Sequence, residues 1–528
     1  MPVCHSGGLA GTRNGVFAPR HRPLAIAMSA LLLGGAAVRE AAAQAFPASL
    51  GAGSISHPLG TRFSGASGER SGSAIAAAGD VNGDNVGDFI IGAPNAAPNG
   101  AGSGSSYLVF GRTPPFMNSD NPTQLNGSNG FRIDGAAAGD QSGYSVSSAG
   151  DINGDGIDDL AIGAPRVDSN GADSGAVYVV FGKNTPFAAG IALSTLNGSN
   201  GVRFDGASAG DLAGFSVAAA GDINGDGRDD LVVGARFANT NGSSYVVFGR
   251  STPFPATFAL SALSGTDGFR LDGGAGINSS GFTVSPAGDI NGDGRSDLLI
   301  GSTSGAHVVF GRSTAFSATL ALSALSGSDG FRIADAGGFS GSAVAAAGDV
   351  NGDRIDDVVV AAFGLAPNGS SSGSSFVVFG KTTPFAATLV LTDLDGNNGF
   401  RINGAAAQDY SGRVVGAADI NGDALGDLII GAYGADPGAL QAGAAYIVYG
   451  QRTPFSPSVA VSTLDGSNGF RITGLAFNDQ LGRAVTGAGD VTGDGVDDLI
   501  VGAPRAGGSA GTSYVLFGND RIRRDGFE

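Results

Sequence analysis

A nine-residue acidic loop recurs seven times along the chain and constrains its fold more than any other feature. In the second copy, Asp151–Asp159, carboxylates or an amide stand at positions 1, 3, 5 and 9. The seven copies begin at Asp80, Asp151, Asp222, Asp289, Asp349, Asp419 and Asp490. Successive copies therefore start 60 to 71 residues apart. A repeat of this kind indicates one structural unit that is used seven times.

Each repeat also contains four short segments that favour β-strands. In the second repeat these segments are Tyr144–Ser148, Leu160–Ile162, Val177–Phe181 and Val202–Phe204. Segments rich in Gly, Ser and Asn separate them, as expected of turns. The pattern predicts an all-β fold, a seven-bladed β-propeller of four-stranded antiparallel blades. A linear β-solenoid is the competing architecture, but its rungs are much shorter than these units.

The two ends of the repeat region favour a closed ring. The last repeat reaches Tyr514–Gly518 without a fourth strand, while a copy of that strand, Thr61–Gly65, precedes the first loop. Pairing between these segments would complete the last blade and leave no open edge. The tail segment Arg521–Arg524 is a rival for this place, but the long arm that precedes a fourth strand is missing there. We therefore expect the N-terminal strand to close the last blade.

The first residues have the pattern of a secretory signal peptide. Arg13, Arg20 and Arg22 precede an apolar run over residues 24–38, and Ala41–Ala43 follows it. The run is short for a membrane span, so an uncleaved anchor is the less favoured alternative. The sequence predicts export to the cell surface or exterior, with no membrane span in the mature chain. The expected parts are a signal peptide (1–43), a leader (44–58), the propeller (59–518) and a C-terminal tail (519–528).

Composition limits what can stabilise an exported chain. Cleavage near residue 43 would remove Cys4, the only cysteine, so no disulfide could form. The net charge is −18, and residues 1–43 carry four Arg and one Glu, which leaves −21 on the rest. This acidity argues against nucleic acid or anionic lipid as a partner. Seven bound Ca²⁺ ions would reduce the charge to about −7.

The loops carry the oxygen ligands that Ca²⁺ prefers, namely side-chain oxygens at positions 1, 3, 5 and 9 and the backbone carbonyl of position 7. No His or Cys lies in them, which argues against zinc and copper, and Mg²⁺ demands a more regular geometry. We expect up to seven structural Ca²⁺ ions. The predicted ligands are Asp80, Asn82, Asp84, Val86, Asp88, Asp151, Asn153, Asp155, Ile157, Asp159, Asp222, Asn224, Asp226, Arg228, Asp230, Asp289, Asn291, Asp293, Arg295, Asp297, Asp349, Asn351, Asp353, Ile355, Asp357, Asp419, Asn421, Asp423, Leu425, Asp427, Asp490, Thr492, Asp494, Val496 and Asp498.

Two other interpretations of the loop are weaker. Asp-Gly and Asn-Gly pairs form ordinary hairpin turns without an ion, but seven sets of three carboxylates would repel one another unless a cation neutralised them. An EF-hand loop needs a ligand near position 12 and a helix after it, whereas position 12 here is apolar, as at Ile162.

The seven sites should differ in affinity. Position 6 requires a positive φ, which suits Gly156 and is tolerable for Asn85, but is costly for Arg354 and Ala424. In the seventh loop Thr492 replaces the Asn of the other copies. We predict that the fifth and sixth sites bind Ca²⁺ most weakly.

The repeats resemble the FG-GAP repeats of the integrin α-subunit N-terminal propeller and its bacterial secreted relatives, over roughly residues 59–518. The resemblance rests on Gly-aromatic pairs such as Gly143-Tyr144, on the D-x-N-x-D-x-x-x-D loops, and on Gly-Ala-Pro at 92–94, 163–165 and 502–504. Repeats three to six depart from Gly-Ala-Pro. The resemblance implies calcium loops between the first two strands on the lower face of each blade, and a ligand site on the opposite face.

Few residues are available for catalysis. After residue 43 the only histidines are His57 and His307, and the only glutamates are Glu69 and Glu528. His307 lies in an aromatic strand, where packing is expected. A nucleophilic triad is therefore nearly excluded, and we predict no catalytic residue and no enzyme activity.

The resemblance implies a secreted adhesion or ligand-binding module with a protein or glycan partner. The variable loops, links such as Gly135–Ser142, and the side chains of Tyr410 and Tyr433 would form the binding face. An aromatic patch there would favour this function. The alternatives are a secreted carbohydrate-active enzyme, which carboxylates buried in the central channel would favour, and a structural envelope protein without a discrete ligand. The sequence does not identify the ligand.

Overall fold

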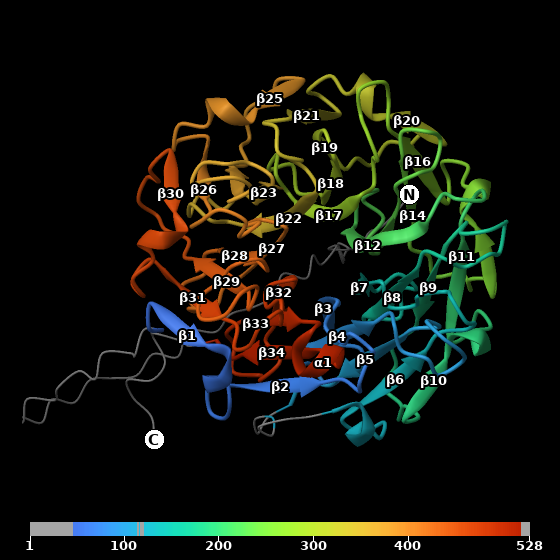
Figure 1. Ribbon diagram of the computed structural model, residues 1–528. Helices are drawn as coiled ribbons and strands as arrows, with labels where there is room; N and C mark the ends of the chain where they lie inside the picture. The colour runs from blue at the N-terminus through green and yellow to red at the C-terminus, as the bar shows by residue number, and fades with distance from the viewer. Residues whose placement is uncertain (1–45, 113–115, 117–120, 519–528) are drawn as a thin grey trace, which may run out of the picture. The chain divides into compact units, whose positions relative to one another are not determined.

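The computed structural model describes residues 46–112, 116 and 121–518. These residues form a seven-bladed β-propeller, as the sequence predicts (Figure 1). Neighbouring blades contact each other through their inner strands around the full ring, and β32 (Ala484–Gly489) meets β3 (Ala74–Gly79) where the ring closes. The expected signal peptide (1–43) and C-terminal tail (519–528) lie outside the described residues.

The blades are numbered by their acidic loops, and their strands are given from the axis outward. Blade 1 consists of β3, β4 (Asp88–Ala93), β5 (Ser105–Val109), β6 (Gly130–Asp134) and β10 (Gly190–Ala192). Blade 2 consists of β7 (Ser145–Gly150), β8 (Asp159–Ala164), β9 (Ala176–Val180), β11 (Gly201–Asp205) and β15 (Thr257–Ala259). Blade 3 consists of β12 (Ala213–Gly221), β13 (Asp230–Ala235), β14 (Ser243–Val247), β16 (Gly268–Asp272) and β20 (Thr319–Ala321). Blade 4 consists of β17 (Thr283–Gly288), β18 (Asp297–Ser302), β19 (Gly305–Val309), β21 (Gly330–Ala334) and β25 (Thr388–Val390).

The remaining blades follow the same plan. Blade 5 consists of β22 (Ala343–Gly348), β23 (Asp357–Ala362), β24 (Ser374–Val378), β26 (Gly399–Asn403) and β30 (Ser458–Ala460). Blade 6 consists of β27 (Val414–Ala418), β28 (Asp427–Ala432), β29 (Ala444–Val448), β31 (Gly469–Thr473) and β1 (Ser49–Gly51). Blade 7 consists of β32, β33 (Asp498–Ala503), β34 (Thr512–Leu516) and β2 (Gly60–Ser64). Helical turns are short: α1 (Ala506–Ser509) and 3₁₀ turns at Ala52–Ser54, Pro122–Gln124, Leu193–Thr195, Leu260–Ala262, Leu322–Ala324, Leu391–Asp393 and Val461–Thr463.

Six blades have five strands where four were expected. The fifth is a three-residue strand in the arm of the following blade, and it pairs in parallel with the outer strand, as Ile191 of β10 does with Ile133 of β6. Three residues are too few to show the alternation of apolar and polar residues by which strands are recognised in a sequence. The extra strand covers the outer edge of one blade with chain from the next, and so ties the two together.

The N-terminal segment closes the ring, as predicted. β2 pairs antiparallel with β34, with Phe63 opposite Ser513, and supplies the missing strand of blade 7. Residues 46–58, expected as a leader, contribute the parallel strand β1 to blade 6. Phe46 stacks on Phe470 with ring centroids 4.5 Å apart, much as Phe187 of an internal arm stacks on Phe131 at 4.4 Å. The segment therefore replaces a complete arm as well as a strand.

The apolar core is divided among the seven gaps between blades. Each gap holds one cluster with side chains from both adjacent blades, such as Phe131 of blade 1 with Ile162 of blade 2. All six residues of the second strand are buried in every blade, which explains its continuous apolar run. Burial of each large side chain contributes about 1.5–3 kcal/mol. A blade thus depends on its neighbours for stability.

Among the described residues, no helix is long and apolar enough to cross a membrane.

Truncation of a closing side chain tests the role of the N-terminal strand. Phe63 of β2 and Phe204 of β11 hold equivalent places in their blades, and both are almost fully buried. We expect Phe63→Ala and Phe204→Ala each to lower the free energy of unfolding by about 3–5 kcal/mol, because each leaves a cavity in an interblade core. Chemical denaturation measures both. Loss of stability in Phe204→Ala alone would show that β2 is not part of the stable ring.

Candidate functional site

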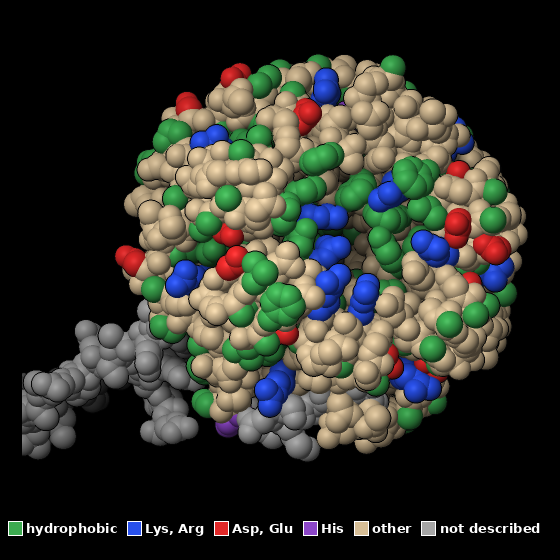
Figure 2. Space-filling view, viewed as in Figure 1, with side chains coloured by type: hydrophobic (Ala, Val, Ile, Leu, Met, Phe, Trp, Pro, Cys, Tyr) green, Lys and Arg blue, Asp and Glu red, His purple; other side chains and the backbone are tan. Residues whose placement is uncertain are grey.

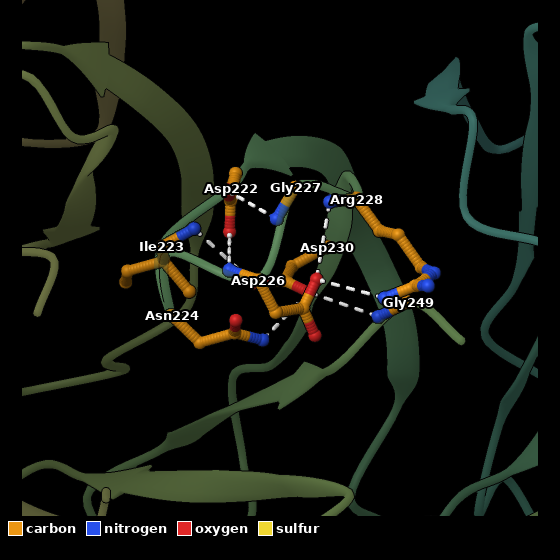
Figure 3. Close-up of polar contacts among 8 residues, drawn as sticks. All are labelled: Asp222, Ile223, Asn224, Asp226, Gly227, Arg228, Asp230 and Gly249. Carbon is orange, nitrogen blue, oxygen red and sulfur yellow. Dashed lines mark hydrogen bonds and ion pairs between the residues drawn. The ribbon is translucent and has the colours of Figure 1, made fainter. Parts of the chain in front are cut away.

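The seven acidic loops join the first and second strands of their blades. The arms, which lead from the third to the fourth strand of a blade, lie at the same end of the sheets as the acidic loops. We call this side of the ring the lower face. The upper face carries the loops between the second and third strands and the links from one blade to the next. The third loop, between β12 and β13, illustrates the geometry (Figure 3).

The aspartates at positions 1 and 5 fold the loop by accepting hydrogen bonds from its backbone. Asp222 Oδ1 accepts from the Asp226 amide at 2.9 Å, and Asp222 Oδ2 accepts from the Gly227 amide at 2.7 Å. Asp226 Oδ1 in turn accepts from the Arg228 amide at 3.1 Å. Short acidic side chains stabilise tight turns in this way. These carboxylates therefore have a structural role whether or not an ion is bound.

The aspartate at position 9 is fully buried where the second strand begins. Asp230 Oδ1 accepts from the Gly249 amide at 2.9 Å, and Asp230 Oδ2 accepts from the Ile223 amide at 3.2 Å. One side chain thus joins the start of the loop, the second strand and the end of the third strand. Asp88, Asp159, Asp230, Asp297, Asp357, Asp427 and Asp498 all have zero exposure.

Burial makes the charge of this carboxylate costly. It raises the pKa of Asp230 to about 8, against the lowering effect of the hydrogen bond from Gly249, and the charges of Asp226 and Asp222 raise the pKa further. The pKa values of Asp88, Asp159, Asp297, Asp357 and Asp498 are likewise about 8, and that of Asp427 is well above the ordinary value. A cation beside the loop would reverse this effect.

The donor set of the loop fits a hard cation, although its carboxylates point to backbone amides in this structure. Within the described part of the chain, no three acidic, His or Cys side chains converge closely enough to form a ready-made metal site. Each carboxylate oxygen has two lone pairs, so a hydrogen bond to one oxygen leaves room for an ion. Side-chain rotations at positions 1, 3, 5 and 9 would be required to bring their oxygens to one ion.

Position 6 has a positive φ in all seven loops, as expected. The angles are 64° at Asn85, 87° at Gly156, 84° at Gly227, 85° at Gly294, 69° at Arg354, 62° at Ala424 and 89° at Gly495. Position 7 adds a feature that the ligand pattern did not indicate. Arg228 Nη1 lies 3.5 Å from Asp226 Oδ1, and Arg295 Nη1 lies 3.7 Å from Asp293 Oδ1. In loops 3 and 4 these arginines compete with any cation for the position-5 carboxylate.

Position 8 links neighbouring blades, a role that the loop pattern did not reveal. Asp158 Oδ2 in blade 2 accepts a hydrogen bond from the amide of Asp80 in blade 1 at 2.8 Å. Asp229, Asp356 and Asp497 make the same bond to the loops of blades 2, 4 and 6. The paired Asp-Asp at positions 8 and 9 was the available signal. Where position 8 is Gly87, its own amide instead donates to the Asp490 carbonyl at 3.1 Å.

A cavity opens on the axis at the upper face and runs between the inner strands. Its volume is about 690 Å³. Figure 2 shows basic side chains gathered around this hollow. The cavity is lined by Arg70, Arg413, Arg483 and Arg505, and by the aromatic residues Tyr144, Phe215 and Phe282. None of the described residues that line it is Asp or Glu.

Aromatic pairs extend the upper face beyond the cavity. Tyr410 and Tyr433, both named as candidate contacts, stack with ring centroids 5.4 Å apart. Phe339 stacks on Phe363 at 5.4 Å and remains 56% exposed. Large exposed apolar side chains are costly on a surface without a partner, so this patch favours binding.

The FG-GAP repeat family matches six segments of the chain: residues 71–109, 142–180, 213–247, 280–315, 411–448 and 481–516. Each segment covers the first three strands of one blade and its acidic loop. The chain is an FG-GAP repeat protein. Blade 5 is outside the matched segments, yet β22, β23 and β24 of this FG-GAP propeller pair as their counterparts do.

Several curated proteins are similar to part of the FG-GAP propeller. Integrin alpha-PS5 of Drosophila melanogaster is 36% identical over 182 residues, which are 33% of this chain and 16% of the relative. Integrin alpha-7 of Homo sapiens is 35% identical over 170 residues, 32% of this chain and 13% of the relative. Phosphatidylinositol-glycan-specific phospholipase D of Bos taurus is 33% identical over 168 residues, 31% of this chain and 18% of the relative. The alignments span less than a fifth of each of these relatives.

His307 of the FG-GAP propeller lies in β19 and is almost fully buried. Burial lowers the pKa of its imidazole to about 4, and the nearby charge of Arg332 acts in the same direction. Neither ring nitrogen has a hydrogen-bond partner among the described residues. Tyr245 of blade 3 and Phe376 of blade 5 hold the equivalent strand position. His307 therefore packs in the sheet, as expected, and has no access to a substrate.

Replacement of Asp158 tests the link between blades. Asp158→Gly should lower the free energy of unfolding by about 0.5–1.5 kcal/mol, because the Asp80 amide loses its acceptor. Asp158→Asn keeps an oxygen that can accept and should remain closer to the wild type. Chemical denaturation of the two variants measures the difference. Equal effects of Gly and Asn would show that the hydrogen bond does not stabilise the ring.

Replacement of His307 tests its burial through pH. The unfolded chain takes up a proton at His307 below its ordinary pKa of 6.5, whereas the folded state resists until about 4. Stability from the neutral imidazole is therefore complete above 6.5 and is lost as the pH falls towards 4. Relative to the wild type, His307→Phe should gain about 2 kcal/mol more at about pH 5 than at neutral pH. A gain independent of pH would contradict the lowered pKa.

Proposed function

We propose that this FG-GAP propeller is an exported, calcium-stabilised module that binds a protein or glycan ligand on its upper face. The observation that supports ligand binding is the exposed aromatic and apolar patch of that face. Export is supported by the signal-peptide pattern of residues 1–43 and by similarity to integrin α-subunits.

Calcium would be held by the five loop positions named from the sequence. In loop 2 these are the side chains of Asp151, Asn153, Asp155 and Asp159 and the backbone carbonyl of Ile157. Two features support the assignment: the donors are all oxygen, and a buried carboxylate stands beside two further carboxylates that raise its pKa. A bound Ca²⁺ would supply positive charge there and would hold the first two strands together.

The metal would be structural, because the loops and the exposed aromatic patch lie on opposite faces. The ion would stabilise the blades from the lower face, while the upper face stays open to the ligand. In a chain without disulfides after residue 43, such ions would be the main cross-links.

Ligand binding is favoured over glycoside hydrolysis. A hydrolase of this kind needs a pair of carboxyl groups facing the substrate. The axial cavity offers arginines and aromatic rings instead, and the described residues that line it include no carboxylate. Among the relatives, the integrin α-subunits are consistent with binding, and the similarity to the phospholipase D covers only 18% of that enzyme.

Thermal unfolding tests the role of calcium. Ca²⁺ should raise Tm and a chelator should lower it, because a ligand that binds only the folded state stabilises that state. Asp159→Asn should reduce the calcium-dependent increase more than Asp357→Asn does, since Arg354 makes the fifth site weak. Asp393→Asn, at an exposed position outside the loops, is the control. An unchanged Tm on chelation would refute the calcium proposal. Ligand binding is tested separately, by screening glycans and matrix proteins against the calcium-loaded protein.

A further inference from the structure

We infer that the axial cavity of the upper face binds a carboxylate of an acidic peptide segment that also carries apolar side chains, presented by a partner protein. The inference rests on the proposed ligand-binding function and specifies its ligand class. It is carried by four arginines in one cavity, by the absence of a counter-charge around them, and by the apolar rim.

The arginines of the cavity have no anionic partner in the described part of the chain. Ion pairs lie elsewhere, and none of their residues lines the cavity: they include Arg132–Asp134, Arg203–Asp205, Arg228–Asp226, Arg270–Asp272 and Arg295–Asp293. The guanidinium of Arg505 donates only to the amide oxygen of Asn478, at 3.2 Å. The chain as a whole carries a charge of −18, so this concentration of positive charge is a local feature. An incoming anion would relieve the mutual repulsion.

Burial and repulsion act together at Arg413. Burial lowers the pKa of its guanidinium, and the charges of Arg483 and Arg236 lower it further. The guanidinium groups of Arg483 and Arg236 are thus close enough to Arg413 to repel it. The Arg236 guanidinium lies over the ring of Phe215, 4.2 Å from its centroid, and its Nε is buried without a hydrogen-bond partner among the described residues.

Aromatic rings hold the guanidinium groups in place. The Arg413 guanidinium lies 5.1 Å from the ring centroid of Phe363, and that of Arg483 lies 5.3 Å from the centroid of Tyr433. Stacking uses the flat face of a guanidinium and leaves the N–H groups on its edge free. Those N–H groups match the two oxygens of a carboxylate. The side chains are therefore oriented before a ligand arrives, which lowers the entropy cost of binding.

The apolar rim of the cavity favours a peptide over a glycan or a free anion. The guanidinium of Arg236 stacks on Phe215 and also lies 4.3 Å from the ring centroid of Phe237, which is 49% exposed. On the other side, the ring of Phe363 contacts Arg413 and stacks on Phe339, which is 56% exposed. Aromatic rings alone could stack on sugars, but the aliphatic side chains of the cavity wall, such as Val217, gain most from apolar side chains. Buried aromatic and arginine contacts are also typical of the energetic centre of protein interfaces.

Fluorescence anisotropy of a labelled peptide of alternating Glu and Phe tests the inference on the calcium-loaded protein. Binding should weaken with salt, and the peptide with Gln in place of Glu should bind much less. Arg413→Gln combined with Arg483→Gln should weaken binding by roughly tenfold or more, since charged hydrogen bonds are lost. Arg70→Gln with Arg505→Gln, both at exposed positions, should also weaken binding and avoids any effect of a buried substitution on folding.

The control removes the same charge elsewhere. Arg62→Gln with Arg401→Gln changes two outer strands and should leave the affinity unchanged. Equal binding by the control and by both cavity variants would overturn the inference, as would absence of peptide binding. Arginine-dependent binding of polygalacturonate without peptide binding would assign the cavity to an acidic glycan and also overturn it. Phe477, on a link of the upper face, is 68% exposed and lies outside the cavity lining. If a glycan or matrix protein binds the cavity variants as well as the wild type but no longer binds Phe477→Ser, the proposed function stands and only this inference fails.

Discussion

A buried carboxylate at the start of each second strand is the constraint on which the propeller depends. Asp159 and its six counterparts each accept a hydrogen bond from a glycine amide just after the third strand. Six of the seven also accept one from a backbone amide of the loop, so the side chain fixes where three segments meet. Burial of an ionised carboxylate is costly even with such hydrogen bonds. A proton or a cation at each of the seven places would offset this cost, and the neighbouring acids at positions 1 and 5 are the reason for proposing a cation.

The connections between blades explain how a ring of small sheets remains closed. No blade can bury its faces alone, because every apolar cluster contains side chains from two blades. Position 8 adds a hydrogen bond from one loop to the next, and the arm adds a parallel strand to the preceding blade. Where the series would end, Phe46, β1 and β2 repeat the arm and outer strand of an internal blade. The ring thus has the same contacts at its closure as elsewhere.

The fold was predictable because the repeats agree with one another. One copy of Asp151–Asp159 could be a simple turn, whereas seven copies in register with four strand segments indicate a propeller, and Thr61–Gly65 indicates its closure. The parallel strands were missed because three residues carry no periodicity. The arm at Phe46 was missed because it lacks the Thr-Pro-Phe sequence that marks four of the other arms, as at Thr185–Phe187. The role of Asp158 was missed because its partner lies in another blade, and sequence spacing contains no information about such a contact.

The two faces of the ring are under different physical constraints. On the lower face, the loops depend on their acids to fold, and positions 1, 5 and 9 are Asp in all seven copies. Where each inner strand begins on the upper face, the equivalent residues differ from blade to blade, and all but one are at least partly exposed. They are Ser73, Tyr144, Phe215, Phe282, the buried Ser342, Arg413 and Arg483. Neighbouring rings at this position touch, with centroids 5.0 Å apart for Tyr144 and Phe215 and 5.4 Å apart for Phe215 and Phe282. One side of the cavity is therefore aromatic and the other basic. A ligand with one charged end and one apolar end can satisfy both sides in a single orientation, so an asymmetric site arises from a nearly symmetric scaffold.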